Sequence, residues 1–195
     1  MKKNDHRIYV DLEYCYPGMT QEKGRPSEDE QRQIVQISAI LFDNTTGEEL
    51  RHFDMLTKPF FEKSLPPFFT ELTHITDVQI EKSAFDFPEA LKHFIIFAQD
   101  YPIWTFNADW GVLKQNCTYF HIPFHYAEQP FIRVRPQLAG WGIDANQYSS
   151  GTLHKAVGLE MNGHVHNALH DVRSMAQAVC ILENISSARV QKTDF

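Results

Sequence analysis

Apolar residues in the first third of the chain follow the pattern of three β-strands. The runs 8–10 and 34–42 are apolar and rich in β-branched residues, and 49–56 follows a turn signal at 44–47. This pattern predicts that the second and third strands form an antiparallel hairpin with a tight turn. The polar stretch 17–33, which is interrupted by proline and glycine, predicts a long, exposed and mobile loop.

The remainder of the chain alternates between helical and strand patterns. Thr76 and Gln79 have the spacing of a capping box that opens a helix, Pro88 suits a first helical turn, and Gly158 suits a helix end. We expect further helices at 68–74, 88–98, 109–120 and 152–157, a long last helix with an apolar stripe from 169 to 179, and short strands at 103–106 and 131–134. This order favours an α/β fold, a mixed central sheet with helices on both faces, over an α+β domain with segregated layers.

Composition is consistent with a single domain. The chain has 195 residues, of which 43% are apolar, enough for one core. We expect one domain over 1–195, with a core at about 7–185 and a short C-terminal tail at 186–195. The net charge of −7 argues against a protein that coats duplex DNA by charge alone.

The sequence carries no signal for secretion or for a membrane. Its longest apolar stretches are too short to span a bilayer, and the first residues lack the apolar segment of a signal peptide. The three cysteines are far apart and form no CxxC pair. These features predict a reduced, cytoplasmic protein without disulfides.

Four carboxylates stand at the ends of predicted strands and helices. Asp11 and Glu13 follow the first strand, Asp109 follows the strand at 103–106, and Asp171 begins the last helix. Residues i and i+2 of a strand point to the same face, so Asp11 and Glu13 project together. Like charges held side by side need a cation between them. The set predicts a site for two Mg²⁺ or Mn²⁺ ions, which prefer oxygen ligands and can promote phosphodiester hydrolysis.

Histidines accompany the last carboxylate, and they leave more than one interpretation open. A neutral histidine beside the ions, such as His166, could accept a proton from an attacking water. His164, His166 and the pair His170-Asp171 could instead belong to a zinc or iron hydrolase, although such enzymes are mostly helical. Taken singly, each feature is also typical of a solvated strand end, a helix N-cap or a polar helix start.

The combined order of these motifs resembles a known family. Asp11-x-Glu13, Asp109 and His166-x4-Asp171 look like the three exonuclease motifs of the DnaQ-like DEDDh superfamily of 3′→5′ exonucleases. The resemblance implies that Asp11, Glu13 and Asp171 ligate the tighter metal ion and that Asp11 bridges both ions. It also implies that Asp109 acts at the second ion and that His166 is the general base.

Further stretches place the resemblance within the family. Residues 34–41 are similar to the family's second strand, and 68–76 to its F-x-x-x-L-T-x-I-T segment. Together with 150–156, the latter looks closest to the KapD and Eri-like branch, whose members trim RNA 3′ ends. The resemblance covers 7–182 and implies a ribonuclease-H-like domain. Its expected substrate is the 3′ end of single-stranded RNA, or of single-stranded DNA as the alternative, and its products are nucleoside 5′-monophosphates.

The same resemblance suggests which residues contact the terminal nucleotide. Phe68 matches an aromatic residue that packs against the terminal base, and Leu72 and Ile75 lie in the same nucleotide-facing segment. Leu12, between the first two acids, is expected to contact the nucleotide as well.

The chain departs from the family pattern at several positions. Ala108 stands where the Eri-like branch often has an aromatic residue, and His74 stands where glycine is common. The loop 17–33 is longer than in proofreading subunits. Asn167 excludes the tyrosine variant of the family. A non-catalytic binding module on the same fold is the remaining alternative, but such a module is expected to have lost at least one acid.

Overall fold

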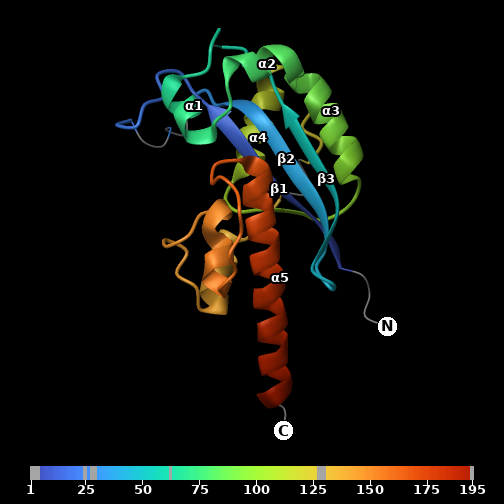
Figure 1. Cartoon of the computed structure of the whole chain (residues 1–195). Coiled ribbons are helices and arrows are strands. Elements are labelled where there is room, and N and C mark those ends of the chain that lie inside the picture. Colours follow the sequence, from blue (N-terminus) through green and yellow to red (C-terminus); the bar gives the residue numbers. More distant parts are fainter. Residues whose placement is uncertain (1–4, 24–25, 27–29, 62, 127–130, 194–195) are drawn as a thin grey trace.

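A five-stranded mixed sheet forms the centre of the molecule (Figure 1). The computed structural model describes the chain except residues 1–4, 24–25, 27–29, 62, 127–130 and 194–195 and the side chains after residue 185. The strands are β1 (His6–Cys15), β2 (Gln33–Asp43), β3 (Glu48–Leu56), β4 (Ile103–Thr105) and β5 (Ile132–Arg133).

The strand order is β3-β2-β1-β4-β5. The pairs β1–β2 and β2–β3 are antiparallel, whereas β1–β4 and β4–β5 are parallel. The hairpin between β2 and β3 turns through residues 44–47, as the sequence predicts. With helices on both faces, this mixed sheet confirms the predicted ribonuclease-H-like α/β class.

The helices begin and end close to the predicted positions. The capping box of Thr76 and Gln79 is formed, and a proline occupies the first turn of the next helix. The helices are α1 (Pro67–Thr73), α2 (Asp77–Ser83), α3 (Phe87–Ala98), α4 (Asp109–Tyr119) and α5 (Ala168–Thr193), with 3₁₀ helices η1 (Arg135–Trp141) and η2 (Ser150–Val157).

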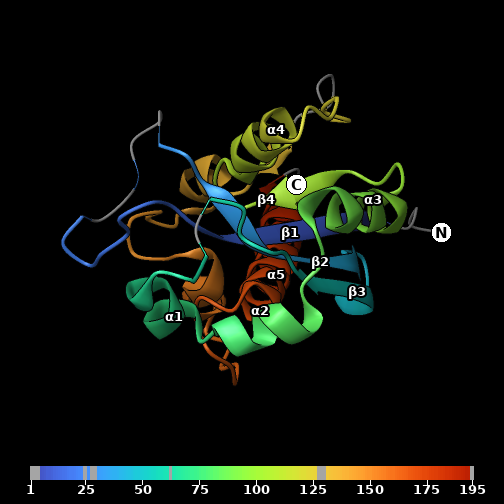
Figure 2. The same ribbon diagram turned by 90° about the horizontal axis from the view of Figure 1, so that it is seen from above.

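Alternation along β1 divides the core into two layers. Ile8, Val10 and Leu12 pack with α3 and α4 on one face of the sheet. Tyr9 points to the opposite face, where it packs with α5, η1 and η2. Figure 2 shows α3 and α4 on one side of the sheet and α5 on the other. Because Asp11 and Glu13 share the parity of Tyr9, both acids project toward the α5 side.

A third, smaller apolar cluster lies where α1 and α2 meet the ends of β1 and β2. Its buried members are Cys15, Val35, Leu65, Phe69, Ile75 and Ile80. This cluster fixes the segment 67–83 beside the end of the sheet at which the acids lie.

The structure corrects four local expectations. The first strand continues to Cys15, so Asp11 and Glu13 lie inside β1 rather than at its end. The segment 152–157 belongs to a 3₁₀ helix, although Gly158 ends it with a positive φ as expected. Gln33 is buried and begins β2 instead of ending the loop. Residues 186–193, expected as a tail, continue α5.

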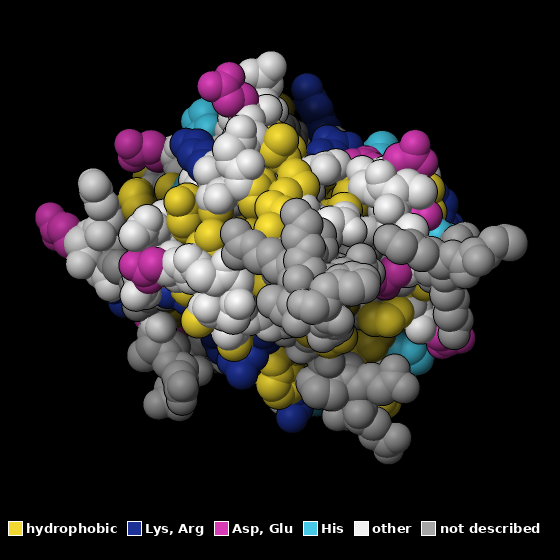
Figure 3. All heavy atoms as spheres, turned by 90° about the horizontal axis from the view of Figure 1, so that it is seen from below, with side chains coloured by type: hydrophobic (Ala, Val, Ile, Leu, Met, Phe, Trp, Pro, Cys, Tyr) yellow, Lys and Arg dark blue, Asp and Glu magenta, His cyan; other side chains and the backbone are white. Residues whose placement is uncertain are grey.

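The described residues of the loop 17–33 are exposed or partly buried, apart from the buried Gln33. Residues 24–25 and 27–29 of this predicted mobile loop lie outside the described residues. Seen from below, the coloured Lys and Arg side chains are interspersed with Asp and Glu side chains (Figure 3). Among the helices that the structure describes, none is long and apolar enough to cross a membrane.

Candidate active site

Strand β1 supplies two of the four acids from its interior. Asp11 pairs with Ser38 of β2, and Glu13 pairs with Gln36, just before a register shift between Glu13 and Tyr14. The side chains of Asp11 and Glu13 are nearly buried, with 8% and 9% of their surface exposed. Both carboxylates therefore sit on the sheet surface beneath the start of α5.

Asp109 enters the site from the first residue of α4, directly after β4. It does not act as the helix N-cap, because Ala108 occupies that position and makes no side-chain cap bond. The hydroxyl of Thr105, the last residue of β4, instead donates a hydrogen bond to the Asp109 carboxylate. This contact between strand end and helix start aims the third acid at the cleft.

Asp171 enters from the first turn of α5. Asn167 precedes that helix, and its side-chain oxygen accepts a hydrogen bond from the His170 amide at 3.2 Å, which fixes the helix start. The Asp171 side chain is only 3% exposed. Its Oδ2 accepts a hydrogen bond from the Ser150 hydroxyl at 3.3 Å, whereas its buried Oδ1 has no hydrogen-bond partner within the described structure.

Close packing around Asp171 requires a glycine at position 151. A Cβ built on Gly151 would lie 2.7 Å from Cγ of Asp171, closer than ordinary contacts allow. The start of η2 thus approaches the carboxylate through its backbone. The sequence comparison pointed to the segment 150–156 but assigned no role to Ser150 or Gly151.

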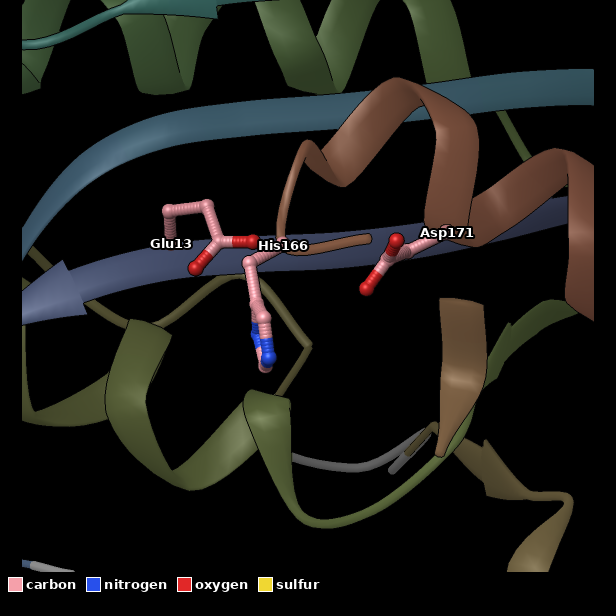
Figure 4. Close-up of side chains that lie close together, drawn as sticks. All are labelled: Glu13, His166 and Asp171. Atoms are coloured by element: carbon pink, nitrogen blue, oxygen red, sulfur yellow. The ribbon is translucent and has the colours of Figure 1, made fainter. Parts of the chain in front are cut away.

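His166 lies in the loop before α5 and faces the acids. Side-chain atoms of Glu13, His166 and Asp171 that could ligate a metal all lie within 4.8 Å of one another. Figure 4 shows these three side chains side by side, from β1, the loop and α5. The backbone of His166 has a φ of 70°, in the left-handed region that non-glycine residues seldom adopt. Such strained residues cluster at functional sites.

The other two histidines of the predicted cluster lie elsewhere. His170 donates to the carbonyl of Gly151 at 3.2 Å and is not among the residues that line the cleft. His164 donates to the carbonyl of Leu72 at 2.9 Å. Among the described residues, the one candidate metal group contains two carboxylates and one histidine. This geometry disfavours a zinc or iron hydrolase built on the histidines.

Burial raises the pKa of every acid in the site, and the charges of neighbouring acids raise it further at Asp11 and Glu13. Burial raises the pKa of Asp109 to about 6 and that of Asp171 to about 7. Burial, followed by the charges of the neighbouring acids, raises the pKa of Asp11 and Glu13 well above the ordinary values. A group of acids in this state favours protons or cations.

Burial has the opposite effect on the base candidate. It lowers the pKa of His166, and the charge of His164 lowers it further. The imidazole of His166 is therefore neutral at physiological pH and can accept a proton.

The donor set fits divalent cations that prefer oxygen ligands. The four carboxylates are nearly buried and close together, yet no described basic side chain forms an ion pair with them. The orphaned Oδ1 of Asp171 is an acceptor that lacks a donor. Cations such as Mg²⁺ or Mn²⁺ would satisfy both features.

The acids and His166 line one cleft of about 400 Å³. Sequence reasoning missed two cations, Arg32 and Arg135, on its wall. Arg32 donates to Gln115 at 3.1 Å, and Arg135 donates to Asn146 at 3.0 Å. No motif marks either arginine in the sequence, because each reaches the cleft only through the tertiary fold.

The predicted nucleotide-contacting residues divide into two groups. Leu12 lines the cleft. Phe68, Leu72 and Ile75 are not among its lining residues and belong to α1 and the segment that follows it. Ile75 is 4% exposed and packs in the third apolar cluster, whereas Phe68 is half-buried beside the fully buried Phe69. Contact of these residues with a nucleotide stays a prediction.

Comparisons with known proteins agree with this site. The family description Exonuclease (RNase T) matches residues 10–179, most of the chain. The fold and the acidic cleft define an exonuclease of the DEDDh type. The chain belongs to the RNase T exonuclease family and, within it, to the DnaQ-like DEDDh 3′→5′ exonucleases. No curated protein matches the sequence.

Solved structures share the fold at low sequence identity. The nuclease domain of 3′hExo bound to rAMP superimposes with a TM-score of 0.79 at 19% identity, over 94% of each chain. A 3′-exonuclease that recognises the 3′ end of the histone mRNA stem-loop gives 0.80 at 18% identity, over 94% of this chain and 84% of that one. The zinc-bound E. coli exonuclease I–ssDNA complex gives 0.67 at 18% identity, over 98% and 43%.

Proposed function

We propose that the protein removes nucleotides one by one from the 3′ end of single-stranded RNA and releases nucleoside 5′-monophosphates. The observation that carries this proposal is the convergence of four nearly buried carboxylates and one histidine of lowered pKa on a single cleft. All four acids are present, which disfavours a non-catalytic binding module on the same fold.

The four acids would hold two Mg²⁺ or Mn²⁺ ions. Asp11, Glu13 and Asp171 would bind one ion, Asp11 would also reach the second, and Asp109 would act at that second ion. When bound, such a pair of ions activates a water and stabilises the leaving oxygen of a phosphodiester. The raised pKa values of Asp109 and Asp171 mean that a cation competes with protons at these positions near neutral pH.

His166 would accept the proton of the attacking water at one of its ring nitrogens. Its position beside Glu13 and Asp171 places it at the acids, and its lowered pKa keeps the ring unprotonated. Arg32 and Arg135 on the cleft wall offer positive charge to the phosphates of the strand.

We propose RNA rather than DNA as the substrate because the segments 68–76 and 150–156 look closest to a branch that trims RNA. Two structural neighbours support this choice through their own ligands, an adenosine monophosphate and a histone mRNA stem-loop. DNA is the second candidate, supported by the ssDNA complex of exonuclease I.

The test uses matched 5′-end-labelled single-stranded RNA and DNA of one sequence, incubated with Mg²⁺ or Mn²⁺ and sampled over time. We expect a ladder that shortens from the 3′ end, faster on RNA, and nucleoside 5′-monophosphates as products. A 3′-phosphate-blocked RNA and a circular single strand serve as controls. Rapid cutting of the circle would contradict an exonuclease, and faster DNA digestion would favour the second candidate.

A further inference from the structure

Two histidines outside the acidic cleft connect the loop of His166 to helix α1. The ring of His164 stacks on the ring of His74, with centroids 3.8 Å apart and planes 10° apart (His74 is the first residue after α1). His164 also donates to the carbonyl of Leu72 at 2.9 Å, a contact between residues 92 positions apart in sequence.

His164 is part of the same turn as His166. The amide of Asn167 donates to the carbonyl of His164 at 3.2 Å, which closes a four-residue turn with His166 in third place. That place has a φ of 70°. Because a non-glycine residue is disfavoured there, the turn needs contacts on its flanks to keep this conformation.

The flanks of the loop are held by side chains rather than by the apolar core. On one side, Gly163 packs so closely on the ring of His170 that a Cβ would lie 2.9 Å from its Cγ. On the other side, the side chains of His74 and His164 are exposed and border a cavity of about 300 Å³. On this side, the stack and the Leu72 bond are the contacts through which the described structure restrains the His164 side chain.

We propose that His164 and His74 form a clamp that holds the His166 turn against α1, which makes both of them positioning residues for the base. The inference rests on the proposed role of His166. His74 itself occupies the left-handed region, with a φ of 61°, although glycine would adopt this conformation without strain. A histidine at this position makes the local backbone conformation less favourable, but its ring forms the stack with His164.

The conformation of His74 provides a variant that separates stability from positioning. His74→Gly relieves the backbone but removes the stack, so it should fold at least as well as wild type. His121→Gly is the matched control, because His121 is also exposed with a positive φ of 54° and lies after α4. His164→Ala removes both contacts, whereas His164→Gln keeps a side-chain donor for the Leu72 carbonyl but, like His74→Gly, loses the ring stack.

The first readout is hydrogen exchange of the Asn167 amide in the metal-free protein, which does not depend on catalysis. We expect exchange about tenfold faster in His164→Ala, which loses both contacts, about threefold faster in His74→Gly and His164→Gln, which lose only the stack, and little changed in His121→Gly. Unchanged exchange of the Asn167 amide in both His74→Gly and His164→Ala would overturn the inference, whether or not the protein hydrolyses RNA.

The second readout is the split between kcat and KM on a single-stranded oligonucleotide with Mn²⁺. A misplaced base should lower kcat by about tenfold in His164→Ala and by about threefold in His74→Gly and His164→Gln, with KM within about twofold in all three. Faster exchange with an unchanged kcat, or a raised KM alone, would overturn the positioning role. A wild-type protein that hydrolyses no strand would contradict the proposed function, and the exchange result would then decide the clamp by itself.

Discussion

Replacing Asp171 by Asn removes one charge from the four clustered acids and keeps the shape of the side chain. Because burial raises the pKa of Asp171 to about 7, the ionised carboxylate is unfavourable in the metal-free fold. The variant should lose hydrolysis, since the Asp171 carboxylate, whose Oδ1 has no hydrogen-bond partner in the described structure, is proposed to bind metal. It should nevertheless be more stable than wild type when metal is absent.

The size of this gain follows from the pKa. The ordinary value is 3.8, and a rise to about 7 corresponds to a difference of about three pKa units. At about 1.4 kcal/mol per unit, ionised Asp171 lowers the free energy of unfolding by up to about 4 kcal/mol. The start of α5 favours a negative charge, which offsets part of this cost of burial. A net gain of about 2 kcal/mol is therefore expected, or about 4–8 °C in Tm for a chain of this length.

The direction of the pH dependence is also fixed by the raised pKa. The folded protein binds protons more tightly than the unfolded chain, so stability is fully present below pH about 4 and falls as pH rises toward about 7. Thermal melts in EDTA at pH 5 and 7.5 should show a lower Tm at pH 7.5 for wild type. The difference should be smaller in Asp171→Asn, and Mn²⁺ should raise the Tm of wild type more than that of the variant.

Asp100→Asn is the control, because Asp100 is exposed after α3 and away from the cleft. It should leave the Tm within about 1 °C, as surface substitutions usually do. A Tm that falls by several degrees in metal-free Asp171→Asn would refute the reasoning. Asp171 would then serve chiefly the start of α5 and its bond with Ser150, and the acids would not be held against their own repulsion.

Three further predictions concern the base, the nucleotide contact and the metal. His166→Ala should lower kcat by about 10²–10⁴-fold at saturating Mn²⁺, whereas the kcat of His164→Ala and of His170→Ala should stay within about tenfold of wild type. A loss of kcat in either of these two variants that exceeds the loss in His166→Ala would contradict the assignment of His166. Phe68→Ala should raise KM about tenfold with little change in Tm, because base–aromatic stacking contributes about 1–3 kcal/mol. Phe69→Ala is the control and should chiefly lower the Tm. A destabilised Phe68→Ala with an unchanged KM would place Phe68 in the core instead. EDTA should abolish hydrolysis and Mn²⁺ or Mg²⁺ should restore it, whereas rescue by Zn²⁺ alone would favour a different metal site.

Local pattern determined much of the fold. Period-two and helical periodicity, together with the capping box and the prolines, predicted the hairpin and the positions of most helices. These signals depend on residues close in sequence, so they can be identified without knowledge of the tertiary structure. The spacing of Asp11, Glu13, Asp109, His166 and Asp171 likewise indicated the family, because the family motifs are short and local.

The tertiary structure decided where the polar residues of β1 lie. Charged residues predicted an end to the first strand after Val10, since buried charges are unfavourable in a sheet. The strand instead continues to Cys15. Asp11 and Glu13 are tolerated within the strand because their side chains face a cleft that the start of α5 and the segment 148–150 also line. Contacts between segments far apart in sequence thus set the burial that raises the pKa of these acids.

Contacts between segments far apart in sequence also give the three histidines different surroundings. The sequence places His164, His166 and His170 within seven residues, and spacing alone favours His166 as the residue that faces Asp171. It contains no signal that His164 stacks on His74 or that His170 bonds to the carbonyl of Gly151. Those partners lie directly after α1 and in η2, and only the packing of these elements around the start of α5 brings them to the loop.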